Sequence, residues 1–88
     1  MPTERDVADW MIQELSRVDE LYQEDAVAEI EHRFGLEFVY ENPDGGASIS
    51  RKVLRVFREL TGDDVVWERS AGLWRKREPS DRPGRQQD

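Results

Sequence analysis

The residues of this sequence that could act as acids or bases are few and lie apart from one another. His32 is the only histidine, and helical periodicity places it on the polar side of a predicted helix at 24–34. We therefore interpret it as a surface residue and not as a general base. Adjacent carboxylates occur where helix capping and turn formation already account for them; these pairs are Asp19-Glu20, Glu24-Asp25 and Asp63-Asp64. We predict no catalytic residues and a protein that is not an enzyme.

The motifs that bind metals, phosphates and cofactors are also missing. The chain has no cysteine, which excludes disulfides and thiolate metal sites. Asn42-Pro43-Asp44-Gly45 lacks the alternating ligands and the closing Glu of a calcium loop, so we interpret it as a turn. Gly45 and Gly46 are not followed by the Lys and Ser or Thr of a phosphate-binding loop. We predict no metal site and no cofactor, and we infer no small-molecule substrate.

Two groups of basic residues have a spacing that could form a binding surface. On a predicted helix after residue 49, Arg51, Arg55 and Arg58 fall within about 60° of one another, opposite the apolar face. A second group follows on the last predicted strand: Arg75, Lys76 and Arg77. A helix and a hairpin that carry such groups are elements that contact nucleic acid. The alternative is a solvated helix face with incidental arginines.

Charge is divided unevenly along the chain. Residues 1–48 contain 3 Arg and 13 Asp or Glu, a net charge of −10, whereas residues 49–88 contain 10 Lys or Arg and 7 Asp or Glu, a net charge of +3. The whole chain carries −7, which opposes phosphate binding unless the acidic half faces away. The same separation favours docking to a protein partner of complementary charge.

The elements that must position these groups begin with a helix capped by Thr3. Its apolar face, formed by Ala8, Met11, Ile12 and Leu15, is extended at the edge by Val7, Trp10 and Val18. Such an arc is wider than one neighbouring helix covers, so either the helix is central in its own domain or its edge contacts a second subunit. For the second alternative, the predicted oligomer contacts are Val7, Trp10 and Met11.

The rest of the chain predicts two further helices and a hairpin. Leu21 to Gln23 are extended and could add a strand, and the helix at 24–34 ends at Gly35. Residues 36–48 form a loop or a small hairpin. After the third helix, a three-residue loop with Gly72 in the left-handed conformation would place Trp67 opposite Arg75.

These elements predict an α+β, winged-helix-like fold of three helices followed by a C-terminal β-hairpin. The 88 residues suffice for one small domain, predicted at 1–78. Residues 79–88 contain two Pro, one Gly and no large apolar residue, so we predict a flexible tail there.

The segments LYQEDAVAEIEHRFG, FVYENPDGG and KVLRVFRELTGDDVVWERSAGLWRKREP resemble a family of uncharacterised small bacterial proteins that includes integron gene-cassette products. The resemblance covers roughly residues 5 to 85 and implies a winged-helix-like domain. It implies no activity and no site residue, because the family has none assigned.

We expect a non-enzymatic protein-interaction module that binds a protein partner or forms a homodimer. The alternative is a nucleic-acid-binding accessory or regulatory protein that uses the third helix and the hairpin. No run of 18 apolar residues could span a bilayer, and no apolar segment resembles a secretory signal, so a cytoplasmic protein with no membrane partner is expected.

Overall fold

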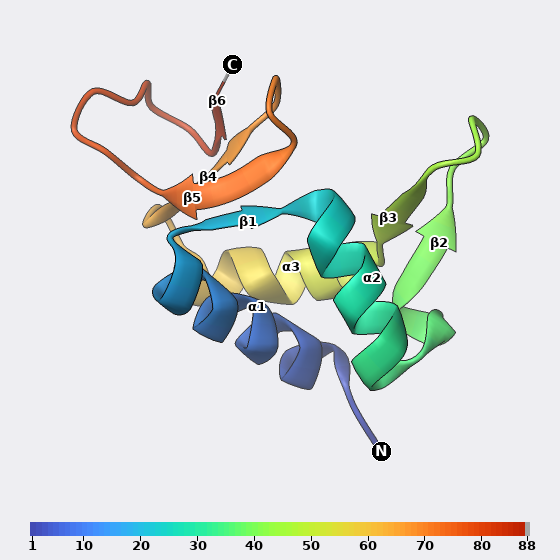
Figure 1. Ribbon diagram of the computed structural model, residues 1–88. Coiled ribbons are helices and arrows are strands. Elements are labelled where there is room, and N and C mark those ends of the chain that lie inside the picture. The colour runs from blue at the N-terminus through green and yellow to red at the C-terminus, as the bar shows by residue number, and fades with distance from the viewer. Residues whose placement is uncertain (88) are drawn as a thin grey trace.

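Figure 1 shows the computed structural model of the protein, which describes residues 1–87. Helices and strands alternate along the chain, which confirms the predicted α+β class. The strands are interleaved with the helices, however, and do not all follow them. The elements are α1 (Glu4–Val18), β1 (Glu20–Tyr22), α2 (Gln23–Phe34), the 3-10 helix η1 (Leu36–Phe38), β2 (Val39–Glu41), β3 (Ala47–Ile49), α3 (Arg51–Thr61), β4 (Val65–Glu68), β5 (Leu73–Lys76) and β6 (Gln86–Gln87).

The first helix begins as its sequence predicts. The hydroxyl of Thr3 accepts a hydrogen bond from the backbone N–H of Asp6 at 3.2 Å, and the Asp6 carboxylate accepts from the N–H of Thr3 at 2.9 Å. This reciprocal pair satisfies two donors that a helix start leaves open. At the other end, Asp19 adopts a left-handed conformation with φ of 67°, which ends α1 and turns the chain directly into β1.

The main sheet brings together strands that are far apart in the sequence. Its order is β1-β5-β4-β6, with β1 and β4 antiparallel to β5, and with β6 parallel to β4. Leu21, predicted to be extended, pairs with Trp74 and so joins β1 to the β4–β5 ribbon. α1 and α3 lie beneath this sheet in Figure 1.

The register of the β4–β5 ribbon differs from the prediction by one residue. Trp67 lies opposite Trp74, and Val66 lies opposite Arg75. The reason is that residues 69–72 form a four-residue connection, not the three-residue loop that was predicted. Gly72 has φ of 68°, the left-handed conformation that its position predicted.

The segment after residue 78 was predicted to be a flexible tail, but the structure gives it a defined path as far as residue 87. The backbone N–H groups of Trp67 and Arg69 donate to the carbonyls of Arg85 and Gln87, both at 2.8 Å. These bonds make β6 the outer strand of the main sheet. The composition of the segment did not reveal them because both partners lie in β4 and the adjoining loop. Asp88, part of the same prediction, lies outside the described residues.

A second, two-stranded sheet lies between α2 and α3 in the sequence and projects from the other end of the molecule (Figure 1). Residues 36–48 were predicted to form either a loop or a small hairpin, and the structure has the hairpin. β2 and β3 are joined by a turn in which Asn42 N–H donates to the Gly46 carbonyl at 2.7 Å. The hairpin ends where Ser50 N–H donates to the Phe38 carbonyl at 2.8 Å, which leads the chain into α3.

The core lies between the helices and the main sheet. Phe57 of α3 is fully buried and meets Trp74 of β5 edge to face, with ring centroids 5.8 Å apart. Trp67 is partly buried and packs against the same cluster. Across residues 1–87, no helix has both the length and the apolar character needed to cross a membrane.

Candidate functional site

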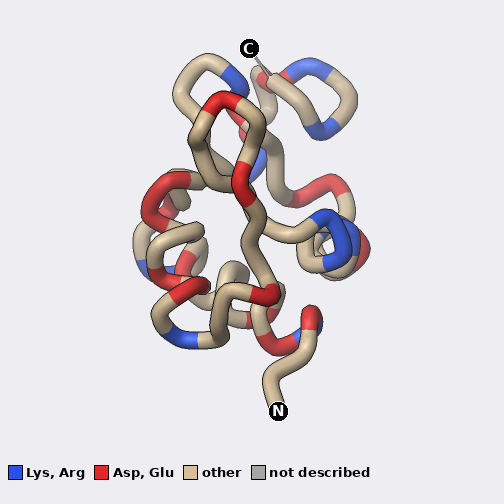
Figure 2. Tube along the Cα trace, turned by 90° about the vertical axis from the view of Figure 1, so that its right-hand side faces the viewer, with Lys and Arg blue, Asp and Glu red and all other residues tan. Residues whose placement is uncertain are grey.

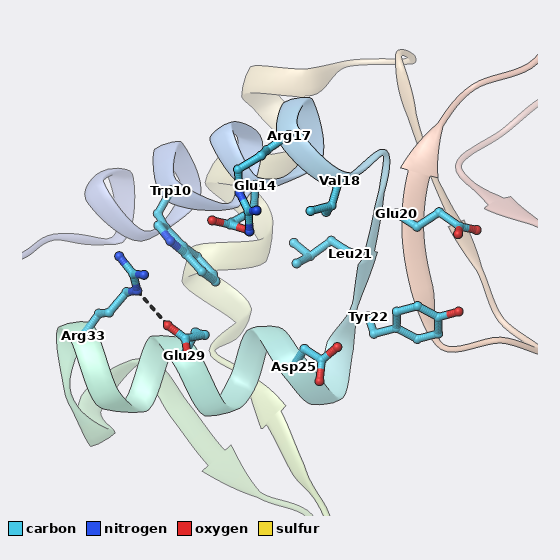
Figure 3. Close-up of a pocket in the computed structure, with 10 residues that line it drawn as sticks. All are labelled: Trp10, Glu14, Arg17, Val18, Glu20, Leu21, Tyr22, Asp25, Glu29 and Arg33. Carbon is cyan, nitrogen blue, oxygen red and sulfur yellow. Dashed lines mark hydrogen bonds and ion pairs between the residues drawn. The ribbon is translucent and has the colours of Figure 1, made fainter.

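A groove forms where α1, β1 and α2 meet, and we call it the acidic groove (Figure 3). Its volume is about 390 Å³, within the size range of ligand pockets. Four of its lining residues are carboxylates and two are arginines. The lining consists of Trp10, Glu14, Arg17, Val18, Glu20, Leu21, Tyr22, Asp25, Glu29 and Arg33.

Helical spacing explains how the two walls of the groove form. On α1, Trp10, Glu14 and Arg17 recur at intervals of four and three residues, so they share one face. On α2, Asp25 and Glu29 recur at an interval of four. β1 connects the two walls and is an edge strand of the main sheet, so one side of its backbone has no neighbouring strand among residues 1–87.

An aromatic side chain forms the apolar part of the groove. The ring of Trp10 meets Phe34 edge to face at 6.3 Å, and the guanidinium of Arg33 lies 5.7 Å from its centre. Val18 is 41% exposed and Tyr22 is 46% exposed, so both offer apolar surface to a ligand. The indole N–H of Trp10 is buried and finds no acceptor in the described part of the chain. A buried donor left unpaired costs about 1–3 kcal/mol.

Ion pairs within the helices use both arginines of the groove. Arg17 donates to Glu14 at 2.7 Å, and Arg33 donates to Glu29 at 2.7 Å. The hydrogen bond from Arg33 lowers the pKa of Glu29, which keeps that carboxylate ionised. Glu20 and Asp25 form no ion pair within residues 1–87. The groove therefore has a surplus of negative charge in addition to its apolar floor.

Two of the three predicted oligomer contacts are not on the surface. Val7 and Met11 have no exposed area and belong to the core of the protein itself, so the prediction was wrong for them. Most of the wide apolar arc of α1 is covered by its own domain, because α3, α2, β1 and β5 all contact this helix, while Val18 at its edge stays 41% exposed. Trp10, the third residue, is half-buried and lines the acidic groove.

The predicted cations of α3 do gather on one exposed face, together with Lys52 and with one exposed carboxylate, Glu59, which lies between Arg55 and Lys52 around the helix. Arg51, Arg55 and Arg58 are all exposed. None of the four basic side chains forms an ion pair or a hydrogen bond with another residue of the described chain. In Figure 2, which is turned from Figure 1, the basic residues gather on α3, seen nearly end-on at the right. We call this surface the α3 basic face.

The second predicted basic group is mostly used inside the protein. Arg75 is 17% exposed and donates to Asp81 at 2.7 and 2.9 Å and to Glu68 at 3.0 Å. These hydrogen bonds raise the pKa of Arg75 well above its usual range. Arg77 donates to the carbonyls of Asp63, Arg82 and Gly84. Lys76 is exposed, whereas Arg75 and Arg77 are half-buried, so the three do not form one exposed cationic surface.

Sequence reasoning placed Glu20 and Asp25 in caps and turns, and it did not identify the groove that they line. The regular spacing of Trp10, Glu14 and Arg17 was visible in the sequence, but it does not reveal which second helix faces it. His32 is exposed on α2, as predicted. Within residues 1–87, no group of three or more acidic or histidine side chains is arranged to hold a metal ion.

Both the groove and the α3 basic face lie in a part of the chain that matches the profile of a protein family. The profile of the family described as "Family of unknown function (DUF6953)" matches residues 3–76. The chain belongs to this family. The DUF6953 match includes α1 to β5 and ends before the segment that forms β6. Searches against the curated proteins and against the solved structures gave no match.

Proposed function

We propose that this protein is a non-enzymatic protein-interaction module whose acidic groove binds an extended, basic segment of a partner protein. The observation that carries the proposal is the pairing pattern in the groove. Glu20 and Asp25 remain available to cations while Arg17 and Arg33 are already paired within their own helices. Trp10 supplies a flat surface for the aliphatic part of a Lys or Arg side chain.

An extended segment suits the groove because β1 lies at the edge of the sheet. A peptide can add to such an edge through main-chain hydrogen bonds, while its side chains enter the neighbouring hollow. The groove holds about 390 Å³, enough for one or two side chains. Exposed charge pairs contribute little each, so a dissociation constant of about 10–100 µM is expected.

The test is fluorescence anisotropy with a labelled peptide that alternates Lys and Leu. The wild-type protein should bind it, with an affinity that falls as salt is added. The double variant Glu20→Lys/Asp25→Lys should bind at least about tenfold more weakly, because it reverses the two unpaired charges. Glu37→Lys/Glu41→Lys is the matched control, since it makes the same change in net charge outside the groove and should leave binding unchanged.

Two results would exclude the groove as the binding site. One is the absence of binding at low salt, and the other is an equal loss of affinity in both double variants. Light scattering on the wild type and on Glu20→Lys/Asp25→Lys shows whether the occupant is a second copy of this chain. A homodimer that dissociates only in the groove variant would place a second copy in the groove.

A second candidate function is nucleic-acid binding through the α3 basic face. It is favoured by the four cations on that face, none of which is paired within residues 1–87. The hairpin contributes little to it, because Arg75 and Arg77 are engaged inside the protein. Replacing Arg51, Arg55 and Arg58 with Ala should abolish a salt-sensitive gel shift. The absence of a shift with any duplex at low salt would exclude this function.

We further propose that the fold is a modified winged helix, as the resemblance to small bacterial proteins implies. Three features support it: the three helices, the β4–β5 ribbon that follows α3, and the pairing of β1 with that ribbon. Two additions distinguish it from the simple form. The β2–β3 hairpin lies between α2 and α3, and β6 extends the sheet beyond the ribbon.

A further inference from the structure

A second pocket lies between α3, the main sheet and the β2–β3 hairpin, and we call it the arginine–tryptophan pocket. Its volume is about 400 Å³. Arg58 and Arg85 supply its charge, and Gln23 is among its polar residues. Its apolar wall consists of Trp67, Trp74 and Phe57, of which Trp67 is the most exposed, since Trp74 is 5% exposed and Phe57 is fully buried. It shares no lining residue with the acidic groove.

The charge of this pocket is unbalanced. Arg85 is half-buried, and it forms no ion pair with a carboxylate in the described chain. Its Nη1 donates to the Thr61 hydroxyl at 3.1 Å and to the Gly62 carbonyl at 3.3 Å, which are neutral acceptors. Burial lowers the pKa of Arg85, and the nearby positive charge of Arg58 lowers it further. Charged groups removed from water are ordinarily paired with an opposite charge.

Two other arginines are partly buried, Arg75 and Arg77. Arg77 bonds to backbone carbonyls and lies outside the pocket, whereas Arg75 shows how carboxylates can balance such a charge. That side chain has two carboxylate partners, Asp81 at 2.7 Å and Glu68 at 3.0 Å. Arg85 instead has a second arginine beside it in the pocket. Two guanidinium groups that open onto one cavity form a site for an anion, because an anion between them would relieve their repulsion and accept charge-assisted hydrogen bonds.

The apolar wall indicates what kind of anion would fit. The rings of Trp67 and Trp74 have centroids 4.7 Å apart, and Phe57 meets Trp74 edge to face at 5.8 Å. The guanidinium of Arg85 lies 5.2 Å from the centre of the Phe57 ring, which fixes it next to this wall. An inorganic anion would leave the aromatic surface unused, whereas a planar ring would pack against it.

We propose that the arginine–tryptophan pocket binds a small organic anion in which a carboxylate or phosphate group is attached to a planar ring. The anionic group lies between Arg58 and Arg85, and the ring lies against Trp67 and Trp74. This site is separate from the groove proposed to bind a protein partner. Arg85 lies beyond the part of the chain that the family profile matches, so the C-terminal segment completes the site.

The experiment is an NMR titration that follows the indole N–H signals of the three tryptophans, assigned with Trp10→Phe and Trp67→Phe. The probes are 2-naphthoate, 1-naphthyl phosphate and the neutral analogue 2-naphthamide. One or both anions should shift the signals of Trp67 and Trp74 but not that of Trp10, and the neutral analogue should bind at least about tenfold more weakly. Comparison of the two anions distinguishes a carboxylate ligand from a phosphate ligand.

Two variants on α3 test the role of charge without disturbing the core. Arg58→Gln should weaken binding at least about tenfold. Arg51→Gln makes the same change of charge on the same helix, but outside the pocket, and should change affinity by less than about twofold. The proposal is overturned if neither anion shifts Trp67 and Trp74 at about 10 mM, if the neutral analogue binds equally well, or if both variants lose the same affinity.

Discussion

The acidic groove and the α3 basic face have opposite surpluses of charge, and pairing within neighbouring elements produces both. Around the groove, Arg17 and Arg33 each bind a carboxylate of their own helix, which leaves Glu20 and Asp25 without partners in the described chain. In the C-terminal half, carboxylates are the groups that become paired, because Arg75 binds both Glu68 and Asp81. The four cations of α3 then remain without acidic partners within residues 1–87.

This comparison shows that a net charge calculated from the sequence understates how far the two signs are separated on the surface. Short-range ion pairs remove part of the minority sign from each region: Arg17 and Arg33 at the groove, and Glu68 and Asp81 in the basic half. Each such pair contributes little to stability when it is solvent-exposed. Its main effect here is on recognition, since it sets which charges remain for a partner.

The largest expected effect concerns the buried face of α1. Met11→Ala should lower the free energy of unfolding by about 2–5 kcal/mol, because it leaves a cavity at a fully buried position. Denaturant unfolding measures this, with the exposed Gln13→Ala as the control, which should change stability by less than about 0.5 kcal/mol. A small loss of unfolding free energy in Met11→Ala, together with a change in oligomeric state, would indicate that Met11 lies in an intersubunit contact.

The next prediction concerns the ion pair between Arg75 and Asp81 in the basic C-terminal half of the chain. The hydrogen bonds from Arg75 and from the backbone N–H of Glu78 hold the pKa of Asp81 well below its usual range. Its contribution to stability is therefore present above the ordinary Asp pKa of about 4 and is lost as the pH falls below it. Asp81→Asn should lower the melting temperature at pH 7, and the difference from wild type should shrink in acid.

Thermal unfolding across a pH series checks this expectation. Asp63→Asn is the matched control, because Asp63 is exposed and its side chain forms no ion pair among residues 1–87. That control should behave like the wild type at every pH. A difference between Asp81→Asn and wild type that stays constant down to low pH would mean that the ion pair with Arg75 is not what stabilises this segment.

A smaller effect is expected when the surplus of negative charge in the acidic groove is enlarged. Arg17→Gln frees Glu14 from its ion pair. The affinity for the Lys-Leu peptide should therefore rise by about two- to threefold at low salt. Arg5→Gln removes the same charge from the same helix outside the groove, where Arg5 pairs with Asp9, and it should leave the affinity within experimental error. Equal gains in both variants would indicate a non-specific effect of net charge.

The smallest effect is a gain in stability on the opposite face. Arg55 lies four residues after Arg51 and three before Arg58, so it is close to two like charges, while Glu59, four residues after it, forms no ion pair with it within residues 1–87. Arg55→Gln should therefore stabilise the protein by about 0.2–0.5 kcal/mol at low salt. The gain should disappear at high salt in denaturant unfolding. A loss of stability instead would show that Arg55 has a favourable partner.

Local signals in the sequence predicted most of the elements. Thr3 and Gly35 mark where a helix begins and another ends through short-range chemistry, and both were identified correctly. Predicting the register of the β4–β5 hairpin required the length of its loop, which Gly72 alone did not determine. Predicting β6 required its parallel pairing with β4, a strand about 20 residues away, and no local pattern encodes such a contact.

The candidate sites were harder to predict than the fold, because each depends on residues from several elements. Periodicity placed Arg51, Arg55 and Arg58 on one exposed face, since a single helix determines that arrangement. It could not show that Arg75 is engaged by Asp81, which lies in the segment predicted to be flexible. The acidic groove arises from the packing of three consecutive elements, and the arginine–tryptophan pocket from segments as far apart as Gln23 and Arg85; local periodicity encodes neither.

The most direct test of the charge separation is a pair of NMR titrations on one ¹⁵N-labelled sample. Two short peptides are used that share a sequence except that every Lys of one is Glu in the other. The basic peptide should shift the Trp10 indole and the backbone amides of residues 20–25, and the acidic peptide should shift only amides of α3. If the basic peptide leaves Trp10 unchanged, or if both peptides shift the same residues, the two surfaces do not act as separate binding sites of opposite charge.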